Sequence, residues 1–361
     1  MNPKEEKEDS AIKKKYIATL IGTGIGDTLG MPVEGWKKEQ IERYERNITE
    51  PTVQSYIYDD SRSLIKEDEY GKIKYYTISL KKGQYTDDTL LTIALAKSIA
   101  EVGAPSLEYI ANEQLITYKK TLANHGTPQR GFGKSTIEAL ENYEKTRDPY
   151  NSGVNLGPGN GPVMKIAPIG IYMDATGEFE TGIKFAKLIA KTTHQDPRSI
   201  VGAAIQANNI YTLLHDTSKN LFIKSAIEIC EEHEEELDSK NGKKDKFPGS
   251  KEGSMLSRLK WIKNNMDAPS KEAYKQLKNS SKVYESFPFA MFMFQKYWDR
   301  PIEGILKTVN YGGDADTTGA IFGALVGAKH GMIFPKEWVE ILEDHDVLED
   351  LGEKLYQLRT R

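Results

Sequence analysis

Cysteine is almost absent from this chain of 361 residues, which contains a single cysteine, Cys230. One thiol can form neither an internal disulfide nor a cysteine-based zinc site, and its isolation is typical of a reducing compartment. The first ten residues are charged and lack the apolar core of a signal peptide. Together these features predict a cytoplasmic location.

Long apolar runs and a strong net charge are also missing. The best candidate for a membrane helix, residues 319–328, ends at Lys329 and falls well short of the ~20 apolar residues that a span needs. Acidic residues number 53 against 49 basic ones, and the formal net charge is -4. The broad positive field that nonspecific nucleic-acid binding requires is therefore absent. We expect neither a membrane nor a nucleic acid as a partner.

Helical periodicity dominates the pattern of apolar residues. It is clear from Ile12 to Leu29, and a second helix is expected to open at Thr86 and run to about Glu101. A chain of this length can bury a substantial core, so the sequence predicts an all-α fold, a single compact domain of many helices. Further helices are expected at residues 106–122, 135–145, 181–192, 199–215 and 221–236, and near residues 274, 288, 302, 319 and 336.

Less regular segments set the expected limits of this domain. Residues 1–10 are predicted to be a disordered tail, and residues 11–361 to form the domain. Glycine and proline are frequent in residues 153–162, which predicts a loop. The segments 43–83 and 236–260 are mixed or polar in pattern and are predicted to be insertions.

Glycine recurs every four residues in two places, at residues 22, 26 and 30 and at residues 319, 323, 327 and 331. Residues four apart share one face of a helix, and a glycine in a helix interior costs up to roughly 1 kcal/mol relative to alanine. Repeated glycines therefore predict that another backbone or a ligand comes close to these faces. Tight helix packing is the favoured interpretation.

Two short acidic segments, Thr-Asp-Asp-Thr at residues 86–89 and Asp-Ala-Asp-Thr-Thr at residues 314–318, each lie where a helix is expected to begin. Either segment alone suits a helix start, because Thr or Asp caps an orphan amide and acidic side chains complement the helix dipole. Together they offer carboxylates and hydroxyls, the oxygen ligands that Mg²⁺, Mn²⁺ and Ca²⁺ prefer. A bound cation would also relieve the repulsion between neighbouring carboxylates.

Two other patterns resemble the second acidic segment. A calcium-binding EF-hand loop that starts at Asp314 would need a glutamate as its twelfth residue, where Leu325 stands. The Asp-x-Asp-x-Thr motif of haloacid-dehalogenase phosphatases follows a buried strand, whereas Tyr311-Gly312-Gly313 precedes the motif here. Both patterns fit this chain poorly.

Four longer motifs follow one another along the chain: Gly-Ile-Gly-Asp-Thr-Leu-Gly-Met-Pro-Val-Glu at residues 24–34, the segment 86–89, Gly-Asn-Gly at residues 159–161, and Gly-Gly-Asp-Ala-Asp-Thr-Thr-Gly-Ala at residues 312–320. In this order they resemble the ADP-ribosylglycohydrolase family, which includes the dinitrogenase-reductase-activating glycohydrolases. Shorter matches at residues 130–133 and 193–197 agree. The resemblance runs from about Ile12 to Gly331 and leaves residues 43–83 unmatched.

This resemblance implies an all-α fold with two divalent cations, Mg²⁺ or Mn²⁺, in a central cleft. Asp316 would bridge the two cations, and Glu34, Asp87 and Asp316 would be the catalytic residues. The implied metal ligands are Thr86, Asp87 and Asp88 on one side of the centre and Asp314, Asp316 and Thr317 on the other.

Substrate-binding residues are implied in the same way. The loop 157–161 would hold the diphosphate or the distal ribose of ADP-ribose through backbone amides, since glycine lets amides approach a phosphate closely. Phe132 also suits a plain core position, His194 also suits a turn or cap, and Asp27 is expected to hydrogen-bond the second acidic segment. The implied substrate-binding residues are Gly131, Phe132, Gly133, Gly157, Gly159, Asn160, Gly161 and His194.

The implied activity is the metal-dependent removal of ADP-ribose from a modified protein, with ADP-ribose as the product. An arginine linkage is favoured, and one further expectation is immunity to an ADP-ribosylating toxin, with residues 43–83 contacting the toxin or the target. Two alternatives stay open at this point. One is a non-catalytic ADP-ribose-binding protein of the same fold, and the other is a metal-dependent phosphatase.

Overall fold

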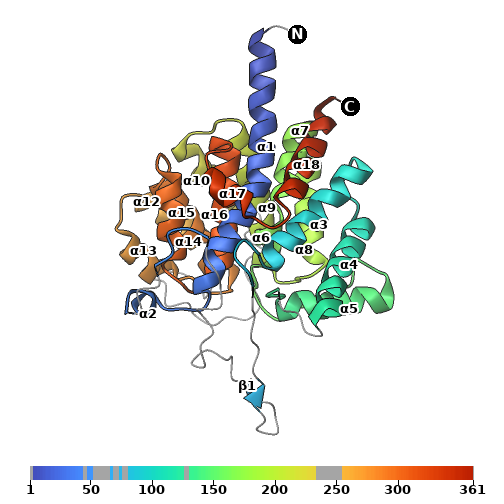
Figure 1. Cartoon of the computed structure of the whole chain (residues 1–361), viewed down its shortest axis with the longest axis horizontal. Coiled ribbons are helices and arrows are strands. Elements are labelled where there is room, and N and C mark those ends of the chain that lie inside the picture. Colours follow the sequence, from blue (N-terminus) through green and yellow to red (C-terminus); the bar gives the residue numbers. More distant parts are fainter. Residues whose placement is uncertain are drawn as a thin grey trace.

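The longest helix, α1 (Pro3–Gly30), runs through the centre of the molecule, and the other helices pack around it (Figure 1). The computed structural model describes residues 3–43, 47–51, 66–67, 73–74, 80–125, 130–232 and 254–360. Within these ranges the only paired strands are β1 (Lys66–Glu67) and β2 (Ile73–Lys74), which are antiparallel. The expected all-α fold is confirmed.

Helix α16 (Ala315–His330) lies antiparallel against α1, and glycines form the contact between them. A methyl group added at Gly22 or Gly26 would overlap the backbone carbonyl of Gly323 or Gly319, respectively. Gly30 meets the backbone of Ala315 in the same way, at the end where α1 finishes and α16 starts. The glycine repeats therefore mark helix packing, as the sequence favoured, and the two backbones touch because no side chains separate them.

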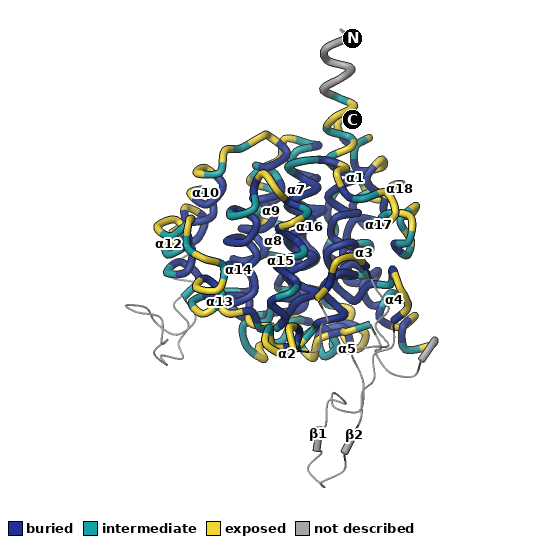
Figure 2. The backbone as a smooth tube through the Cα atoms, turned by 60° about the vertical axis from the view of Figure 1, so that its left-hand side comes forward, coloured by how far each residue is buried: buried dark blue, intermediate teal, exposed yellow. Residues whose placement is uncertain are grey.

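Other helices surround this pair, and the most deeply buried backbone lies along the inner helices, with exposed residues at the periphery (Figure 2). Helix α9 (Pro197–Leu214) contacts α16 and also packs against helices on its far side. The others are α2 (Lys38–Arg43), α3 (Asp87–Val102), α4 (Leu107–His125), α5 (Lys134–Thr146), α6 (Gly161–Lys165), α7 (Ala167–Thr176), α8 (Phe179–Lys191), α10 (Lys219–Glu232), α12 (Met255–Asn264), α13 (Ser270–Leu277), α14 (Val283–Lys296), α15 (Pro301–Val309), α17 (Lys336–Glu340), α18 (His345–Tyr356), and the 3₁₀ turns η1 (Met31–Val33) and η3 (Gln357–Thr360).

Some element boundaries differ from those expected. Helix α1 includes residues 3–10 of the expected tail, since extending an existing helix needs no new nucleus and these residues include good helix formers such as Glu5 and Lys7. The expected loop 153–162 ends at the start of α6. Helix α12 occupies part of the proposed insertion 236–260, and Met255 and Leu259 belong to the core. Most of segment 43–83 and residues 233–253 lie outside the described residues.

The glycine contact gives a first prediction. Gly26→Ala should lower the free energy of unfolding by about 3 kcal/mol or more, because the new methyl group overlaps the Gly319 backbone and can move only by separating the helices. Urea denaturation followed by circular dichroism measures this change. Gly133→Ala is the matched control, since Gly133 has φ -70° and open space around it. An unchanged stability for Gly26→Ala would contradict the packing argument.

Candidate metal centre and substrate cavity

A cavity of about 580 Å³ opens where α1, α3, α6 and α16 converge. Because α1 and α16 are antiparallel, the C-terminal end of α1 and the N-terminal end of α16 meet at this cavity. Helix α3 adds its N-terminal end to the same wall. Three segments that are far apart in the sequence therefore bring Glu34, Asp87, Asp88, Asp314 and Asp316 together along one cavity.

The first acidic segment is built as the start of α3. Thr86 is the N-cap residue, and its hydroxyl accepts a long hydrogen bond of 3.4 Å from the Asp88 amide. The Asp87 amide donates to the Arg130 carbonyl at 2.6 Å. The Thr86 hydroxyl also lies 3.1 Å from an Asp88 carboxylate oxygen, and Thr86 is fully buried behind the acids. Of the three ligands expected here, Asp87 and Asp88 line the cavity and Thr86 supports them.

The second acidic segment is built as the start of α16. Gly312 and Gly313 both have positive φ (66° and 70°), a conformation that glycine adopts at little cost. They turn the chain so that the Gly313 amide donates to the Trp36 carbonyl at 2.7 Å. A side chain from outside the predicted set, Asn279, donates to the Gly312 carbonyl at 2.6 Å. The loop that precedes Asp314 is thereby fixed to the loop that follows Glu34.

Glu34 faces this second segment across the end of α1. Its carboxylate accepts a hydrogen bond from the Ala315 amide at 2.7 Å. One ligand atom from each of Glu34, Asp314 and Asp316 lies within 4.8 Å of the other two. These three carboxylates therefore form the most compact acidic group in the described cavity, on the side where the sequence placed Asp316.

Strong electrostatic repulsion follows from this arrangement. Burial, with Asp316 as the next cause, raises the pKa of Asp314 to about 8. The same two causes raise the pKa values of Glu34, Asp87 and Asp88 well above their usual range. Asp316 is thus the common electrostatic neighbour of the other acids. Such a group is costly unless protons or cations neutralise it.

The residues of this wall fit divalent metal ions. The described ligands are oxygen atoms only, which suits Mg²⁺ or Mn²⁺. The Asp88 Oδ1 atom is buried and has no hydrogen-bond partner among the described residues, although buried polar atoms are usually satisfied. A buried carboxylate oxygen that lacks a hydrogen-bond partner and lies among other acids is suited to coordinate a metal ion.

The cavity also has a lining rich in glycine, the glycine wall. It consists of Gly131, Gly133, Gly157, Gly159 and Gly161, which the sequence proposed as substrate-binding residues. Gly157 and Gly133 have open space where a side chain would stand. The Gly159 amide donates to the Gly157 carbonyl inside the loop, whereas Gly161 is the first residue of α6, where amides lack an intrahelical acceptor.

Two residues that the sequence proposed for substrate binding have other contacts in the structure. Phe132 does not line the cavity; it is buried in a second apolar cluster, with its ring 5.2 Å from that of Tyr118. Asn160 does line the cavity, but its side-chain amide donates to Asp314 and, at 2.8 Å, to the Ser286 hydroxyl. Its visible role is to hold a carboxylate of the acidic wall. Thr317, which the sequence proposed as a metal ligand, lines the cavity.

His194 lies between the glycine loop and a buried lysine. A methyl group at Gly159 would come within 2.8 Å of His194 Nε2, so this nitrogen points at the loop. The other ring nitrogen lies 3.0 Å from the Thr193 hydroxyl, which in turn lies 3.4 Å from Lys165 Nζ. Burial, followed by the Lys165 charge, lowers the pKa of His194 to about 3, so the imidazole is neutral at physiological pH.

Several residues of the site were missed in the sequence. Lys165 is fully buried inside the short helix α6, and burial lowers its pKa to about 7 although Asp87 acts in the opposite direction. Lys134 and Lys282 line the cavity with the glycine wall. A lone lysine carries no spacing signal, so only the fold could reveal these three lysines.

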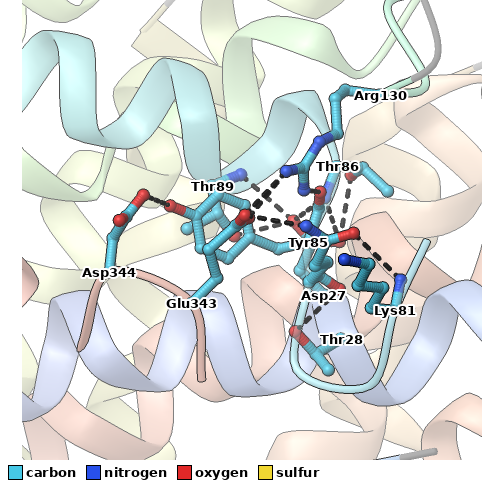
Figure 3. Close-up of polar contacts among 10 residues, drawn as sticks. Asp27, Thr28, Lys81, Tyr85, Thr86, Thr89, Arg130, Glu343 and Asp344 are labelled. Atoms are coloured by element: carbon cyan, nitrogen blue, oxygen red, sulfur yellow. Dashed lines mark hydrogen bonds and ion pairs between the residues drawn. The ribbon is translucent and has the colours of Figure 1, made fainter. Parts of the chain in front are cut away.

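Asp27 was noticed in the sequence, but its partner was predicted wrongly. It hydrogen-bonds Thr86 and Thr89 of the first acidic segment, not the second segment (Figure 3). The reason is geometric: the face of α1 that carries Gly26 is filled by α16, and Asp27, one residue later, points towards α3 instead.

A model of the ADP-ribosylglycohydrolase family matches residues 8–361. The chain belongs to the ADP-ribosylglycohydrolase family. It is 28% identical to an uncharacterised protein of Archaeoglobus fulgidus (97% of this chain, 98% of the relative) and 24% identical to the ADP-ribosylhydrolase ARH3 of Xenopus tropicalis (96% of each). Human ARH3 is 26% identical over 76% of this chain and 78% of its own length.

The structure of an ADP-ribosylglycohydrolase-related protein complex shares this fold. It matches with a TM-score of 0.65 and 22% identity over 97% of this chain and 99% of its own. The family resemblance drawn from the four motifs is therefore confirmed over nearly the whole chain.

Among the described residues no helix is both long and apolar enough to cross a membrane.

The raised pKa values predict how stability depends on pH without metal. A carboxyl group whose pKa is about 4 unfolded and about 8 folded, as for Asp314, stabilises the fold below pH 4 relative to higher pH, and this contribution is lost as the pH rises to 8. We expect the Tm of the metal-free family member to fall between pH 6 and pH 8. Added Mn²⁺ should raise Tm more at pH 8 than at pH 6.

Differential scanning fluorimetry with and without a chelator measures both effects. Asp314→Asn is the control, because it removes the titrating group and should flatten the fall in Tm between pH 6 and pH 8. A Tm that rises over this range in wild type but not in Asp314→Asn would contradict the assignment of a repulsive acidic wall.

Proposed function

We propose that this family member hydrolyses the glycosidic bond that joins ADP-ribose to a protein side chain. The observation that carries the proposal is that two chemically different groups of residues line one cavity. Carboxylates gather after the end of α1 and at the starts of α3 and α16, and glycines, Lys134 and Lys282 line the same cavity. ADP-ribose has the same division, with two phosphates in the middle and a ribose at the reacting end.

The size and charge of the cavity support this orientation. A volume of about 580 Å³ falls within the ~300–1,000 Å³ typical of small-molecule sites. Phosphates are repelled by the acidic wall and favoured by the lysines and by backbone amides that glycine exposes. The terminal ribose would therefore face Glu34 and Asp316, with His194 beside the glycine loop.

The reaction adds one water molecule across one bond. The bond between the ribose anomeric carbon and the side-chain atom breaks, a hydroxyl group joins the carbon, and a proton goes to the leaving side chain. When bound, two divalent cations would supply positive charge that orients the ribose hydroxyls and lowers the pKa of water. In this proposal Asp87, Asp88, Asp314, Asp316 and Thr317 would hold those cations.

Glu34 would take part in proton transfer. It follows the turn η1 at the end of α1, and its carboxylate accepts a hydrogen bond from the Ala315 amide. Positive charge develops on the ribose as the side chain leaves, and the carboxylates of this wall, including Asp87 and Asp316, stabilise it. In this respect the site differs from a glycosidase that relies on two carboxylates alone.

The linkage that is cleaved, the location and the biological role are proposed from the sequence alone. We propose arginine-linked ADP-ribose as the substrate, with a cytoplasmic location and a role in immunity to an ADP-ribosylating toxin. The relatives named ARH3 are described as ADP-ribosylhydrolases, which supports the bond class. Two alternatives are outcomes of the same assay: a protein that binds ADP-ribose without hydrolysis, and a phosphatase that releases phosphate from generic esters.

The decisive experiment compares arginine-, serine- and polymer-linked ADP-ribose side by side, with Mg²⁺, Mn²⁺ or excess chelator. We expect release of free ADP-ribose with metal, fastest from the arginine linkage, and none with chelator. Binding of ADP-ribose without release from any substrate would favour the non-catalytic alternative. Release of phosphate from simple esters would favour the phosphatase, and full activity in chelator would contradict the metal centre.

Substitutions test the acidic wall directly. Asp316→Asn and Asp314→Asn should each lower kcat/KM by at least about 100-fold while the protein stays folded, because each removes a proposed metal ligand. Steady-state kinetics with Mn²⁺ measures this. Asp174→Asn is the control, because Asp174 is also a buried carboxylate but pairs with Arg359 and His215. Equal activity in all variants would contradict the assigned site.

A further inference from the structure

Asp27 lies completely buried in α1 and faces four hydrogen-bond donors, the amides and hydroxyls of the two threonines Thr86 and Thr89 at the start of α3 (Figure 3). The Thr86 amide donates to both carboxylate oxygens, at 3.1 and 3.0 Å, and the Thr86 hydroxyl lies 3.0 Å from Oδ1. The amide and the hydroxyl of Thr89 donate to Oδ2 at 3.1 and 2.7 Å. Asp27 does not line the cavity, so it lies behind the acidic wall.

These contacts cap α3 from another helix. The first amides of a helix lack intrahelical partners, and a side chain of the same segment usually satisfies them. Here Asp27 accepts from the amides of the N-cap residue, Thr86, and of the third helical residue, Thr89. The acids between them, Asp87 and Asp88, do not have to cap their own helix, and both face the cavity.

The chemistry at this position suits only a carboxylate. Every group that points at Asp27 from Thr86 and Thr89 can donate a hydrogen, and an ionised carboxylate accepts without donating. An asparagine of the same shape would turn two N–H groups towards these donors and leave buried groups unsatisfied.

Asp27 also connects the two halves of the acidic wall. It follows Gly26, whose backbone touches Gly319 of α16, so its position relative to the second acidic segment is fixed by the glycine contact. Its hydrogen bonds then fix the first acidic segment relative to the same helix. A shift of α3 would therefore have to break buried hydrogen bonds to Asp27.

A second set of contacts holds the same segment from the opposite side. The Arg130 guanidinium donates to the Tyr85 carbonyl at 2.7 Å and to Glu343 at 2.8 Å (Figure 3). The Tyr85 hydroxyl donates to Asp344 at 2.8 Å. These bonds restrain the chain just before Thr86, so two separate sets of contacts hold the start of α3 in place.

We propose that Asp27 is a positioning residue, which sets the distance between the acid pair of α3 and the acids of α16 without binding the metal or the substrate itself. The inference rests on the proposed function, because that distance matters only if both groups bind cations. Loss of such outer contacts typically weakens metal binding by about 10–100-fold. We therefore expect a weaker metal affinity and a nearly unchanged KM, because the residues of the glycine wall stay in place.

The test measures Mn²⁺ binding to the full-length protein by electron paramagnetic resonance, together with kcat and KM. Asp27→Asn should weaken Mn²⁺ binding at least about tenfold and lower kcat, with KM nearly unchanged at saturating Mn²⁺. Asp174→Asn is the matched control: it is a buried aspartate in another cluster, with a side chain 2% exposed, and it should keep the Mn²⁺ affinity of wild type.

A milder pair of variants covers the case in which Asp27→Asn does not fold. Thr89→Val removes the donor at 2.7 Å and should weaken Mn²⁺ binding several-fold. Thr23→Val is its control, since that buried threonine of α1 donates only within its own helix, to the Thr19 carbonyl at 3.0 Å. It should leave Mn²⁺ binding unchanged.

The outcomes separate this inference from the proposed function. If wild type binds Mn²⁺ and hydrolyses substrate, but Asp27→Asn or, where that variant is unfolded, Thr89→Val binds Mn²⁺ as wild type does, the positioning role is wrong and the function stands. If Asp174→Asn or Thr23→Val loses Mn²⁺ to the same extent, the effect is one of general stability and the role is again wrong. If wild type binds no Mn²⁺, the metal centre and this inference both fail.

Discussion

The backbone contact between α1 and α16 is the constraint on which the cavity depends. Glycines at 22, 26, 319 and 323 let the two helices touch without intervening side chains. This close, antiparallel packing brings the end of one helix beside the start of the other. Glu34 can then receive a hydrogen bond from Ala315, and the acids of α16 have a fixed neighbour. A bulkier contact would separate the helix ends and open the acidic wall.

A cost in electrostatic energy accompanies this geometry. Five carboxylates share one wall, and burial with Asp316 as their common neighbour raises the pKa values of Glu34, Asp87, Asp88 and Asp314. The fold tolerates this repulsion because rigid backbone and buried polar side chains such as Asn160 hold the acids in place. Sites of this kind store unfavourable energy that a bound cation relieves, which links the stability of the domain to its chemistry.

Different parts of the chain supply the acidic lining and the glycine-rich lining of the cavity. Helix ends supply carboxylates, whose direction is set by capping and by the helix axis. The glycine loop around residues 157–161 supplies backbone and open space, and Lys134 and Lys282 add positive charge to the same cavity. Asn160 of the glycine loop contacts the acidic group through Asp314, and the buried Lys165 contacts Thr193 beside His194.

The sequence by itself determined the all-α class, the glycine repeats, the two acidic segments and the family, because each rests on residue type and local spacing. It did not determine how those segments meet. The partner of Asp27, the core position of Phe132, the use of Asn160 on Asp314 and the burial of Lys165 were decided only by the tertiary structure. The physical reason is that each depends on contacts between segments dozens to hundreds of residues apart, which helical periodicity does not encode.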